Sequence, residues 1–329
     1  MSEHLAPTAD PRPETTYDHS LHGTGRPWRG IVAIVVLMAT LLLLSLVFGA
    51  IAIAYEIFTG GMDFNDPDSL LAITPAVLLS SNLALAAMIP LSMGLQRLLF
   101  GVPVRHIFSV AGAFRWRWLG RLALIIVPVW IVYIAVSFAL EPGGEIRIDG
   151  TALALLAVVV LTTPLQAAGE EFGFRGLIQR SVGSWFRHPT VAFAVSTLIS
   201  GALFGAVHFA ADPWLIAYYF LFGVSASIAA RFTGGLEAPV LIHVVNNVLI
   251  FVPAVLLGQL AEGIDRSEGA GGPFMLLPIA VVLGAAALSG WWARRSGVQI
   301  RAPRPLTVAE SRPAAPVDPT PVPPAPPQT

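Results

Sequence analysis

Long apolar runs are the feature that most constrains how this chain folds. A transmembrane helix needs about 20 consecutive apolar residues, and about eight runs approach or exceed that length. They cover residues 30–58, 69–95, 119–140, 152–178, 191–208, 214–230, 236–257 and 274–292. Only 12% of the 329 residues are charged, whereas soluble domains average about 25%. The sequence therefore predicts an all-α fold, a polytopic transmembrane helical bundle.

Arginine residues lie in alternate connections between these runs. Arg26 and Arg29 precede the first run, whereas Asp63, Asp66 and Asp68 follow it. The other Arg-rich connections contain Arg97, Arg105, Arg115, Arg117, Arg180, Arg187, Arg231, Arg294 and Arg295. Because cytoplasmic loops are enriched in basic residues, we expect an integral, multi-pass protein of the plasma membrane with both termini in the cytoplasm.

The two ends of the chain differ from its apolar middle. Residues 1–28 are polar and predict a disordered cytoplasmic arm. Residues 298–329 are rich in Pro and predict a disordered tail. Residues 29–297 form the expected transmembrane domain between them. The net charge of -1 gives no reason to expect a nucleic acid partner, and the absence of Cys excludes disulfides, thiol nucleophiles and cysteine metal ligands.

Three polar patches interrupt the apolar runs, at residues 170–175, 204–208 and 243–247. Ionisable groups are unfavourable at membrane depth, so each patch is a candidate functional site. In the first patch, Glu171 and Arg175 are four residues apart and share a helix face. We therefore assign this pair a supporting role and expect the adjacent Glu170 to be the working carboxylate.

Each of the other patches also has a simpler structural interpretation. A single His such as His208 is more often a hydrogen-bonded structural residue, although the glycines at 201 and 205 would let another helix approach it closely. His243 and Asn247, with a second Asn at 246, could hold helices together. Jointly, however, two carboxylates, two imidazoles and a carboxamide supply a base, a group that shares its proton and donors for an oxyanion. This set favours hydrolysis of a peptide bond.

Taken together, the patches resemble the CPBP family of intramembrane proteases. That family includes the CAAX prenyl endopeptidases and bacterial relatives linked to peptide processing and bacteriocin immunity. Its motifs are Glu-Glu-xxx-Arg, Phe-xxx-His and His-xxx-Asn on successive helices. Here they correspond, in that order, to Glu170-Glu171-xxx-Arg175, Phe204-xxx-His208 and His243-xxx-Asn247. The resemblance covers about residues 150–250.

The resemblance implies an intramembrane endopeptidase in which Glu170 and His208 activate a water molecule, while His243 and Asn247 stabilise the oxyanion. The implied partners are membrane lipid and a lipidated, hydrophobic or membrane-anchored peptide or protein substrate. A metal-dependent mechanism is the open alternative, with Glu170, His208 and His243 as candidate ligands of a divalent metal such as zinc. Because Asn is an unusual zinc ligand, we favour the metal-independent, glutamate-type mechanism.

The expected depths of the three patches do not match. At about 1.5 Å per residue, Glu170 and His243 lie roughly 15 to 18 Å from the nearest Arg-rich turns, whereas His208 lies roughly 30 Å from its own turn. Either the fifth helix is tilted or starts late, or residues 208–214 fold back into a protein-lined cavity. We favour the second, which predicts a polar, water-filled cavity formed by spans four to seven.

Two other classes of function are compatible with the same residues. Charged groups at mid-membrane also mark transporters and channels. Transporters commonly contain inverted repeats with broken helices, and the sequence has no second Glu-Glu motif. A catalytically silent immunity or scaffold protein could keep the motifs for packing alone. Substitution of Glu170 by Gln would abolish the function of an enzyme but preserve that of a scaffold.

Overall fold

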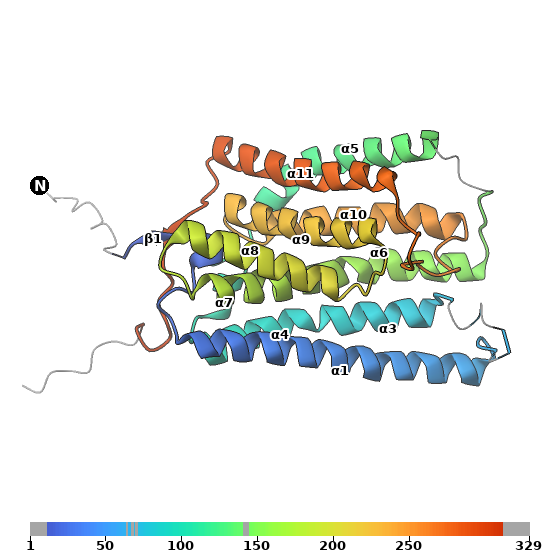
Figure 1. The fold of residues 1–329 in the computed structure, drawn as a ribbon, viewed down its shortest axis with the longest axis horizontal. Coiled ribbons are helices and arrows are strands. Elements are labelled where there is room, and N and C mark those ends of the chain that lie inside the picture. Colours follow the sequence, from blue (N-terminus) through green and yellow to red (C-terminus); the bar gives the residue numbers. More distant parts are fainter. Residues whose placement is uncertain (1–11, 64, 67–68, 70–71, 141–144, 312–329) are drawn as a thin grey trace, which may run out of the picture.

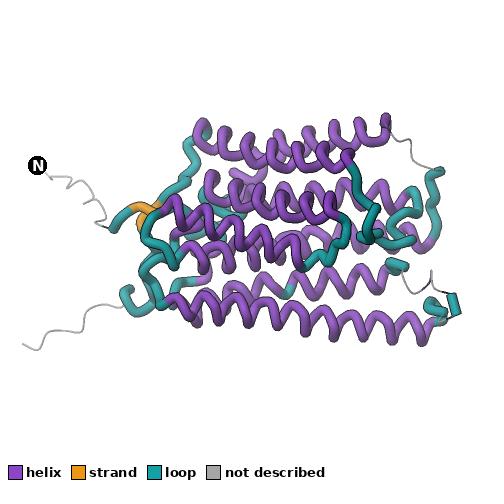
Figure 2. The backbone as a smooth tube through the Cα atoms, viewed as in Figure 1, coloured by secondary structure: helices purple, strands orange, loops and turns teal. Residues whose placement is uncertain are grey.

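The computed structural model describes residues 12–63, 65–66, 69, 72–140 and 145–311. Within them, eight helical segments are long and apolar enough to cross a membrane, and they lie side by side in one bundle (Figures 1 and 2). These segments are Pro27–Thr59, Pro75–Phe100, Trp116–Ala139, Gly150–Gly183, Pro189–Ala206, Pro213–Thr233, Glu237–Leu256 and Pro273–Arg295. The predicted all-α, polytopic bundle is confirmed.

The helices of the bundle take the labels of Figure 1. They are α1 (Pro27–Thr59), α3 (Pro75–Ala86), α4 (Met88–Leu95), α5 (Trp116–Leu140), α6 (Gly150–Glu171), α7 (Arg180–Gly183), α8 (Pro189–Ala206), α9 (Pro213–Thr233), α10 (Glu237–Leu256) and α11 (Leu276–Arg295). Four of them begin at a Pro, namely α1, α3, α8 and α9. Pro is favoured there because the first helical N–H has no partner within the helix. The side chains of Thr74, Asp149 and Asp212 accept backbone N–H groups at the starts of α3, α6 and α9.

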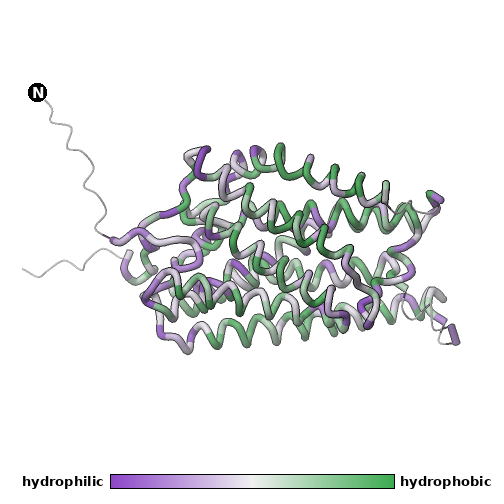
Figure 3. Tube along the Cα trace, turned by 45° about the horizontal axis from the view of Figure 1, so that its top comes forward, coloured by the Kyte–Doolittle hydropathy of each residue, from purple (hydrophilic) through white to green (hydrophobic). Residues whose placement is uncertain are grey.

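The surface of the bundle is apolar where a bilayer would surround it. In α1, the side chains of Leu42, Leu46 and Phe58 are 58%, 63% and 90% exposed. Hydrophilic residues gather toward the two ends of the bundle, and the helices between are largely hydrophobic (Figure 3). Contact of such an apolar surface with lipid is more favourable than its contact with water.

Helix α6 packs between α3 and α10, and α8 and α9 form a hairpin that packs on the segment following α6, with α9 also packing on α11. Glycines set these contacts. A Cβ on Gly169 would lie 2.0 Å from the backbone oxygen of Leu85 in α3, and one on Gly223 would lie 2.8 Å from the Cα of Gly201. The close approach of another helix to Gly201, expected from its spacing, is therefore present between α8 and α9.

The fourth membrane-spanning segment changes its winding at the first polar patch. Helix α6 ends at Glu171, a π-helical stretch covers Phe172–Gln179, and α7 continues from Arg180. π-helical turns are rare and are often found at functional sites. The apolar pattern of residues 152–178 predicted a single span and gave no sign of this change.

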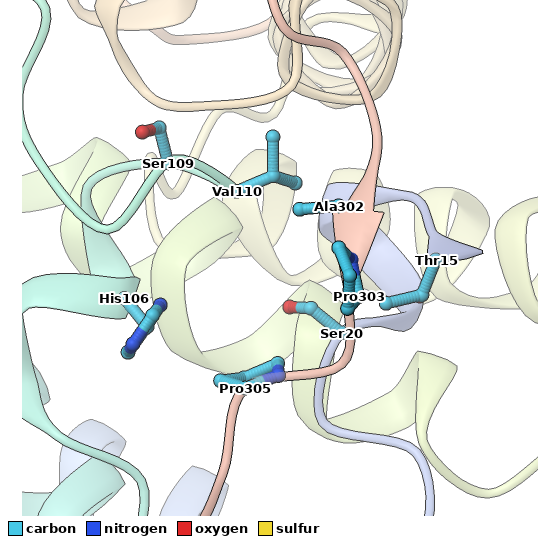
Figure 4. A pocket seen from close by; sticks show the side chains of 8 residues that line it. All are labelled: Thr15, Ser20, His106, Ser109, Val110, Ala302, Pro303 and Pro305. Atoms are coloured by element: carbon cyan, nitrogen blue, oxygen red, sulfur yellow. The ribbon is translucent and has the colours of Figure 1, made fainter. Parts of the chain in front are cut away.

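Both ends of the described chain fold onto one end of the bundle. Strand β1 (Glu14–Thr15) pairs antiparallel with β2 (Ala302–Pro303). Tyr17 is fully buried, and its hydroxyl donates to the backbone oxygen of Ile107. We call residues 12–26 and 299–311 together the terminal clasp. A cavity of about 10 Å³ lies beneath it, lined by His106, Ser20 and Pro303 among others (Figure 4).

The structure thus differs from the disordered arm expected through residue 28 and from the disordered tail expected from residue 298. Two charged contacts explain the order. Arg231 forms an ion pair of 2.7 Å with the buried Asp18, and the buried Arg180 donates to Ser20 at 2.9 Å. Average composition does not reveal such pairings, because each depends on a residue far away in the chain. Residues 1–11 and 312–329 lie outside the described part.

Candidate active site

The first polar patch is buried in the middle of the protein. Glu170 is 5% exposed, and Glu171 and Arg175 are fully buried. All three lie where α6 passes into the π-helical stretch. Because the Glu171 carboxylate and the Arg175 guanidinium have opposite charges, their burial requires that they pair.

Arg175 contacts three different parts of the bundle. Its Nη1 donates to Glu171 Oε1 at 3.0 Å, and its Nη2 donates to the backbone oxygen of Gly223 in α9 at 3.0 Å. The guanidinium also lies 4.5 Å from the centre of the Phe204 ring, within the range of a cation–π interaction. Arg175 therefore connects the first patch to both helices of the α8–α9 hairpin.

His243 joins both carboxylates of the first patch. Its Nδ1 lies 2.8 Å from Glu171 Oε1, and its Nε2 lies 3.8 Å from Glu170 Oε2. Since a carboxylate only accepts hydrogen bonds, Nδ1 carries the proton. The expected role of His243 was to stabilise the oxyanion, and the orientation of its ring by Glu171 was not predicted from the sequence.

One carboxylate oxygen of Glu170 accepts a hydrogen bond, and the other has no hydrogen-bond partner among the described residues. Its Oε1 accepts from Gln166 Nε2 at 2.5 Å. Its Oε2 is buried and has no hydrogen-bond partner among the described residues. Glu171 Oε2 is also buried without a partner, but Glu171 is ion-paired with Arg175, whereas Oε1 of Glu170 is bound by a neutral amide.

Asn247 reaches the same group of residues from α10. Its Nδ2 donates to Gln166 Oε1 at 3.1 Å, so Gln166 connects Asn247 to Glu170. Gln166 is not among the residues predicted from the sequence. The available signal was its position, one helical turn before Glu170 in an otherwise apolar span.

His208 follows the end of α8 and is partly buried. Its Nδ1 lies 2.7 Å from the backbone oxygen of Phe204, and its ring stacks on Tyr219 with centroids 4.0 Å apart. The Phe204 ring lies 4.7 Å from His208 and 5.8 Å from His243. The same Phe204 ring contacts Arg175 of the first patch, so Phe204 links the second patch to the other two.

Two turns bear on the different depths estimated for the three patches from helix length. The turn after Arg231 does not lie at the surface, because Gly234 and Gly235 are buried beneath residues 109 and 299–300. At the other end, the α8–α9 hairpin stops well short of the end of α1 (Figure 1). The connection after α10 covers this hairpin, with Ala211 N donating to Arg266 O at 2.8 Å and Gly269 N to Asp212 Oδ2 at 3.1 Å. The folding of residues 208–214 back into a protein-lined cavity stays a prediction.

A polar cavity around spans four to seven stays a prediction. A cavity of about 390 Å³ lies at the opposite end of the bundle from the clasp, lined by Arg147, Asp149 and Glu262 among others. None of the residues that line it belongs to the three patches.

The metal-dependent alternative requires a set of ligands. Within the described residues, no group of three or more His, Asp or Glu side chains is arranged to hold a metal ion. Nδ1 of His243 is bound to Glu171 and Nδ1 of His208 to a backbone oxygen, which leaves Nε2 of each ring as the nitrogen that a zinc-bound His uses. The metal-dependent alternative, with Glu170, His208 and His243 as ligands, therefore stays a prediction.

Comparison with known proteins agrees with the motifs. Residues 151–249 match the family model described as type II CAAX prenyl endopeptidase, Rce1-like. The chain is also 24% identical over 293 residues to the uncharacterized protein YyaK of Bacillus subtilis (strain 168), a match covering 84% of this chain and 95% of that protein. No solved structure matches the chain. The family resemblance expected from the three patches is confirmed for this central segment.

Proposed function

From the similarity of residues 151–249 to the Rce1-like type II CAAX prenyl endopeptidases, we propose that the chain is an intramembrane endopeptidase with Glu170 as its general base. The observation that carries this proposal is the unpartnered Oε2 of Glu170, buried 3.8 Å from His243 Nε2. A fixed carboxylate whose second oxygen has no partner is suited to accept a proton from water.

The reaction follows from the donors and acceptors around this oxygen. Glu170 Oε2 takes a proton from a water molecule as the water oxygen attacks the carbonyl carbon of the substrate. The carbonyl oxygen becomes an oxyanion, and the C–N bond breaks as the proton moves to the leaving nitrogen. The products are a carboxylic acid and an amine. His208, with Nδ1 bonded to a backbone oxygen, has Nε2 available to share the proton during the transfer.

The oxyanion is stabilised by Asn247 and His243. An amide nitrogen carries two hydrogens, so donation from Asn247 to Gln166 leaves one N–H for the oxyanion. His243 donates from Nε2 only as an imidazolium, because Nδ1 already donates to Glu171. Each donor of this type contributes about 10²- to 10³-fold in rate.

The proposed substrate is a peptide bond in a lipidated, hydrophobic or membrane-anchored peptide. The apolar rings of Phe204 and Phe222 lie against His243, with centroids 5.8 and 4.8 Å away. Such surroundings favour an apolar segment beside the scissile bond over a charged one.

The test is cleavage of a fluorogenic lipopeptide library by the purified protein. We expect Glu170→Gln to lower kcat by about 10³-fold or more, since a general base contributes about 10²- to 10⁴-fold. Glu56→Gln is the matched control, because Glu56 is also a buried carboxylate in a span but lies in α1 and is hydrogen-bonded to Thr74. Folded wild-type protein that cleaves no peptide would contradict the proposal and favour the transporter or scaffold alternatives.

The same assay with a strong chelator tests the catalytic type. Activity that survives the chelator supports the glutamate-type mechanism. Activity that the chelator abolishes and zinc restores would make His208 and His243 metal ligands, and would contradict the oxyanion role proposed for His243.

A further inference from the structure

A line of hydrogen bonds crosses the bundle from α5 and α9 to the active site. It begins at Asn246, which is 6% exposed. The indole Nε1 of the fully buried Trp130 donates to Asn246 Oδ1 at 3.4 Å, and the hydroxyl of Tyr218 donates to the same oxygen at 3.3 Å. An indole N–H only donates. It therefore fixes which end of the Asn246 amide is the oxygen.

The carboxamides of Asn246, Asn247 and Gln166 are hydrogen-bonded in sequence and end at the Glu170 carboxylate. Asn246 Nδ2 donates to Asn247 Oδ1 at 3.1 Å, and Asn247 Nδ2 donates to Gln166 Oε1 at 3.1 Å. Gln166 Nε2 then donates to Glu170 Oε1 at 2.5 Å. Each amide receives at its oxygen and donates from its nitrogen, so all of them point the same way.

The direction of the line has a chemical consequence. If any one amide were turned over, two N–H groups or two oxygens would face each other, and a buried polar group would lose its partner. The last acceptor is Glu170 Oε1. Once that oxygen is held, Oε2 is directed toward His243 Nε2, 3.8 Å away.

We propose that Gln166, Asn246 and Trp130 are positioning residues, which hold the Glu170 carboxylate so that Oε2 faces the reacting water. This inference rests on the proposed function. Neither Asn246 nor Trp130 belongs to the three motifs, and Gln166 precedes the first of them. Because misplacing a catalytic group by about 1 Å lowers rates by about 10²-fold, an orienting chain of this kind affects kcat without contacting the substrate.

The simpler role for these amides is to join α5, α6 and α10 by buried hydrogen bonds. The two roles differ in how substitutions combine. When residues act in series on one group, the effects of their substitutions on kcat are non-additive. Once one hydrogen bond of the line is lost, the loss of a second has no further effect on that group. Residues that merely hold helices together act independently on kcat.

The experiment is a double-mutant cycle with Gln166→Met and Asn246→Leu, both of which keep the side-chain shape and remove the hydrogen bonds. We expect each to lower kcat by about 10- to 100-fold while KM changes less than about 2-fold. The double variant should be no slower than the worse single variant. Trp130→Phe should give a smaller loss, since Tyr218 still donates to Asn246.

The matched control is Asn82→Leu. Asn82 in α3 is 3% exposed and donates to Thr162 and Thr163 of α6, so the substitution removes a comparable buried amide from another interface of α6, outside the line. It should leave kcat near the wild-type value, and its combination with Gln166→Met should be additive.

Wild-type kcat in Gln166→Met, or additive losses in the Gln166–Asn246 cycle, would overturn the inference while leaving the proposed function intact. An inactive wild type would instead contradict the proposed function. In that case, the hydrogen-bond line is tested by the thermal unfolding midpoints of the wild type, the two single variants and the double variant. The line predicts that the decreases in midpoint are non-additive, and additive decreases would refute the line.

Discussion

The two adjacent glutamates differ in their partners. Each has a buried Oε2 without a hydrogen-bond partner among the described residues, but Oε1 of Glu171 binds Arg175 and His243, whereas Oε1 of Glu170 accepts from the neutral amide of Gln166. Loss of charge at Glu171 would leave the fully buried Arg175 without its counter-charge, and breaking a buried pair costs about 3 to 5 kcal/mol. Loss of charge at Glu170 breaks no ion pair with an Arg among the described residues, and His243, 3.8 Å away, keeps Glu171 as its partner.

We therefore predict that Glu171→Gln lowers both the unfolding temperature and activity, while Glu170→Gln abolishes activity with little change in unfolding temperature. Thermal unfolding in detergent, measured on the same preparations as the cleavage assay, checks this. Equal destabilisation by the two substitutions would show that the division into a working and a supporting carboxylate is wrong.

His106, beneath the terminal clasp, gives a prediction about pH. Burial, together with the positive charges of Arg105, Arg180 and Arg12, lowers the pKa of His106 to about 4. Its pKa in the unfolded chain is about 6.5. Between these values the unfolded chain binds a proton that the folded chain does not, so stability falls as pH drops from about 6.5 to about 4.

His106→Gln should remove this part of the acid sensitivity. Unfolding midpoints measured between pH 7 and pH 4.5 should decline less steeply in the variant than in the wild type. His22→Gln, at the same end of the bundle, is the matched control and should keep the decline caused by His106. Parallel curves for wild type and His106→Gln would rule out this explanation.

At the residue scale, helical spacing was enough to predict the pairing of Glu171 with Arg175, since residues four apart share a face. Spacing within one helix does not show which residue of another helix lies opposite. For this reason the sequence did not reveal that His243 bonds to Glu171, or that Gln166 joins Asn247 to Glu170. These contacts depend on how α6 and α10 pack.

At the element scale, the placement of Glu170 depends on the approach of α3 to α6. Gly169 precedes Glu170, and a Cβ there would lie 2.0 Å from the backbone oxygen of Leu85. A backbone atom cannot move aside as a side-chain end does, so a methyl group would push the two helices apart.

We predict that Gly169→Ala lowers both the unfolding temperature and kcat. Gly49→Ala is the control, because nothing lies within 4 Å of a Cβ on Gly49 in α1. There the substitution should be neutral or stabilising by about 1 kcal/mol, as Ala favours helix over Gly. If both variants behaved like the control, close packing at Gly169 would not set the position of Glu170.

The elements themselves were largely predictable, because a bilayer imposes a length and an apolar composition on every span. The π-helical stretch at Phe172–Gln179 was not, since it keeps the apolar pattern of an α-helix. Neither was the order of residues 12–28. Their burial depends on Asp18 meeting Arg231 and on Ser20 meeting Arg180, contacts between segments far apart in the sequence.

At the scale of the whole molecule, the β1–β2 pair places both ends of the described chain at the same end of the bundle. An even number of spans requires this, and the eight spans supply it. The proposal that this end faces the cytoplasm rests on the distribution of Arg.

Single cysteines can test the orientation, because the chain contains none. Arg301 is exposed at the clasp end, and Glu268 is exposed in the connection after α10 at the other end. A membrane-impermeant maleimide should label Glu268→Cys in intact cells and Arg301→Cys only after permeabilisation. The reverse pattern would place the termini outside.

The central claim is that Glu170 activates water for cleavage of a peptide bond, and mass spectrometry of products formed in ¹⁸O-labelled water tests it most directly. Wild-type protein, incubated with its best library peptide, should yield a fragment with a new carboxyl terminus that contains one ¹⁸O atom. Glu56→Gln should give the same product, and Glu170→Gln should give none over the same time. An equal yield from Glu170→Gln, or intact peptide after incubation with folded wild-type protein, would contradict the account.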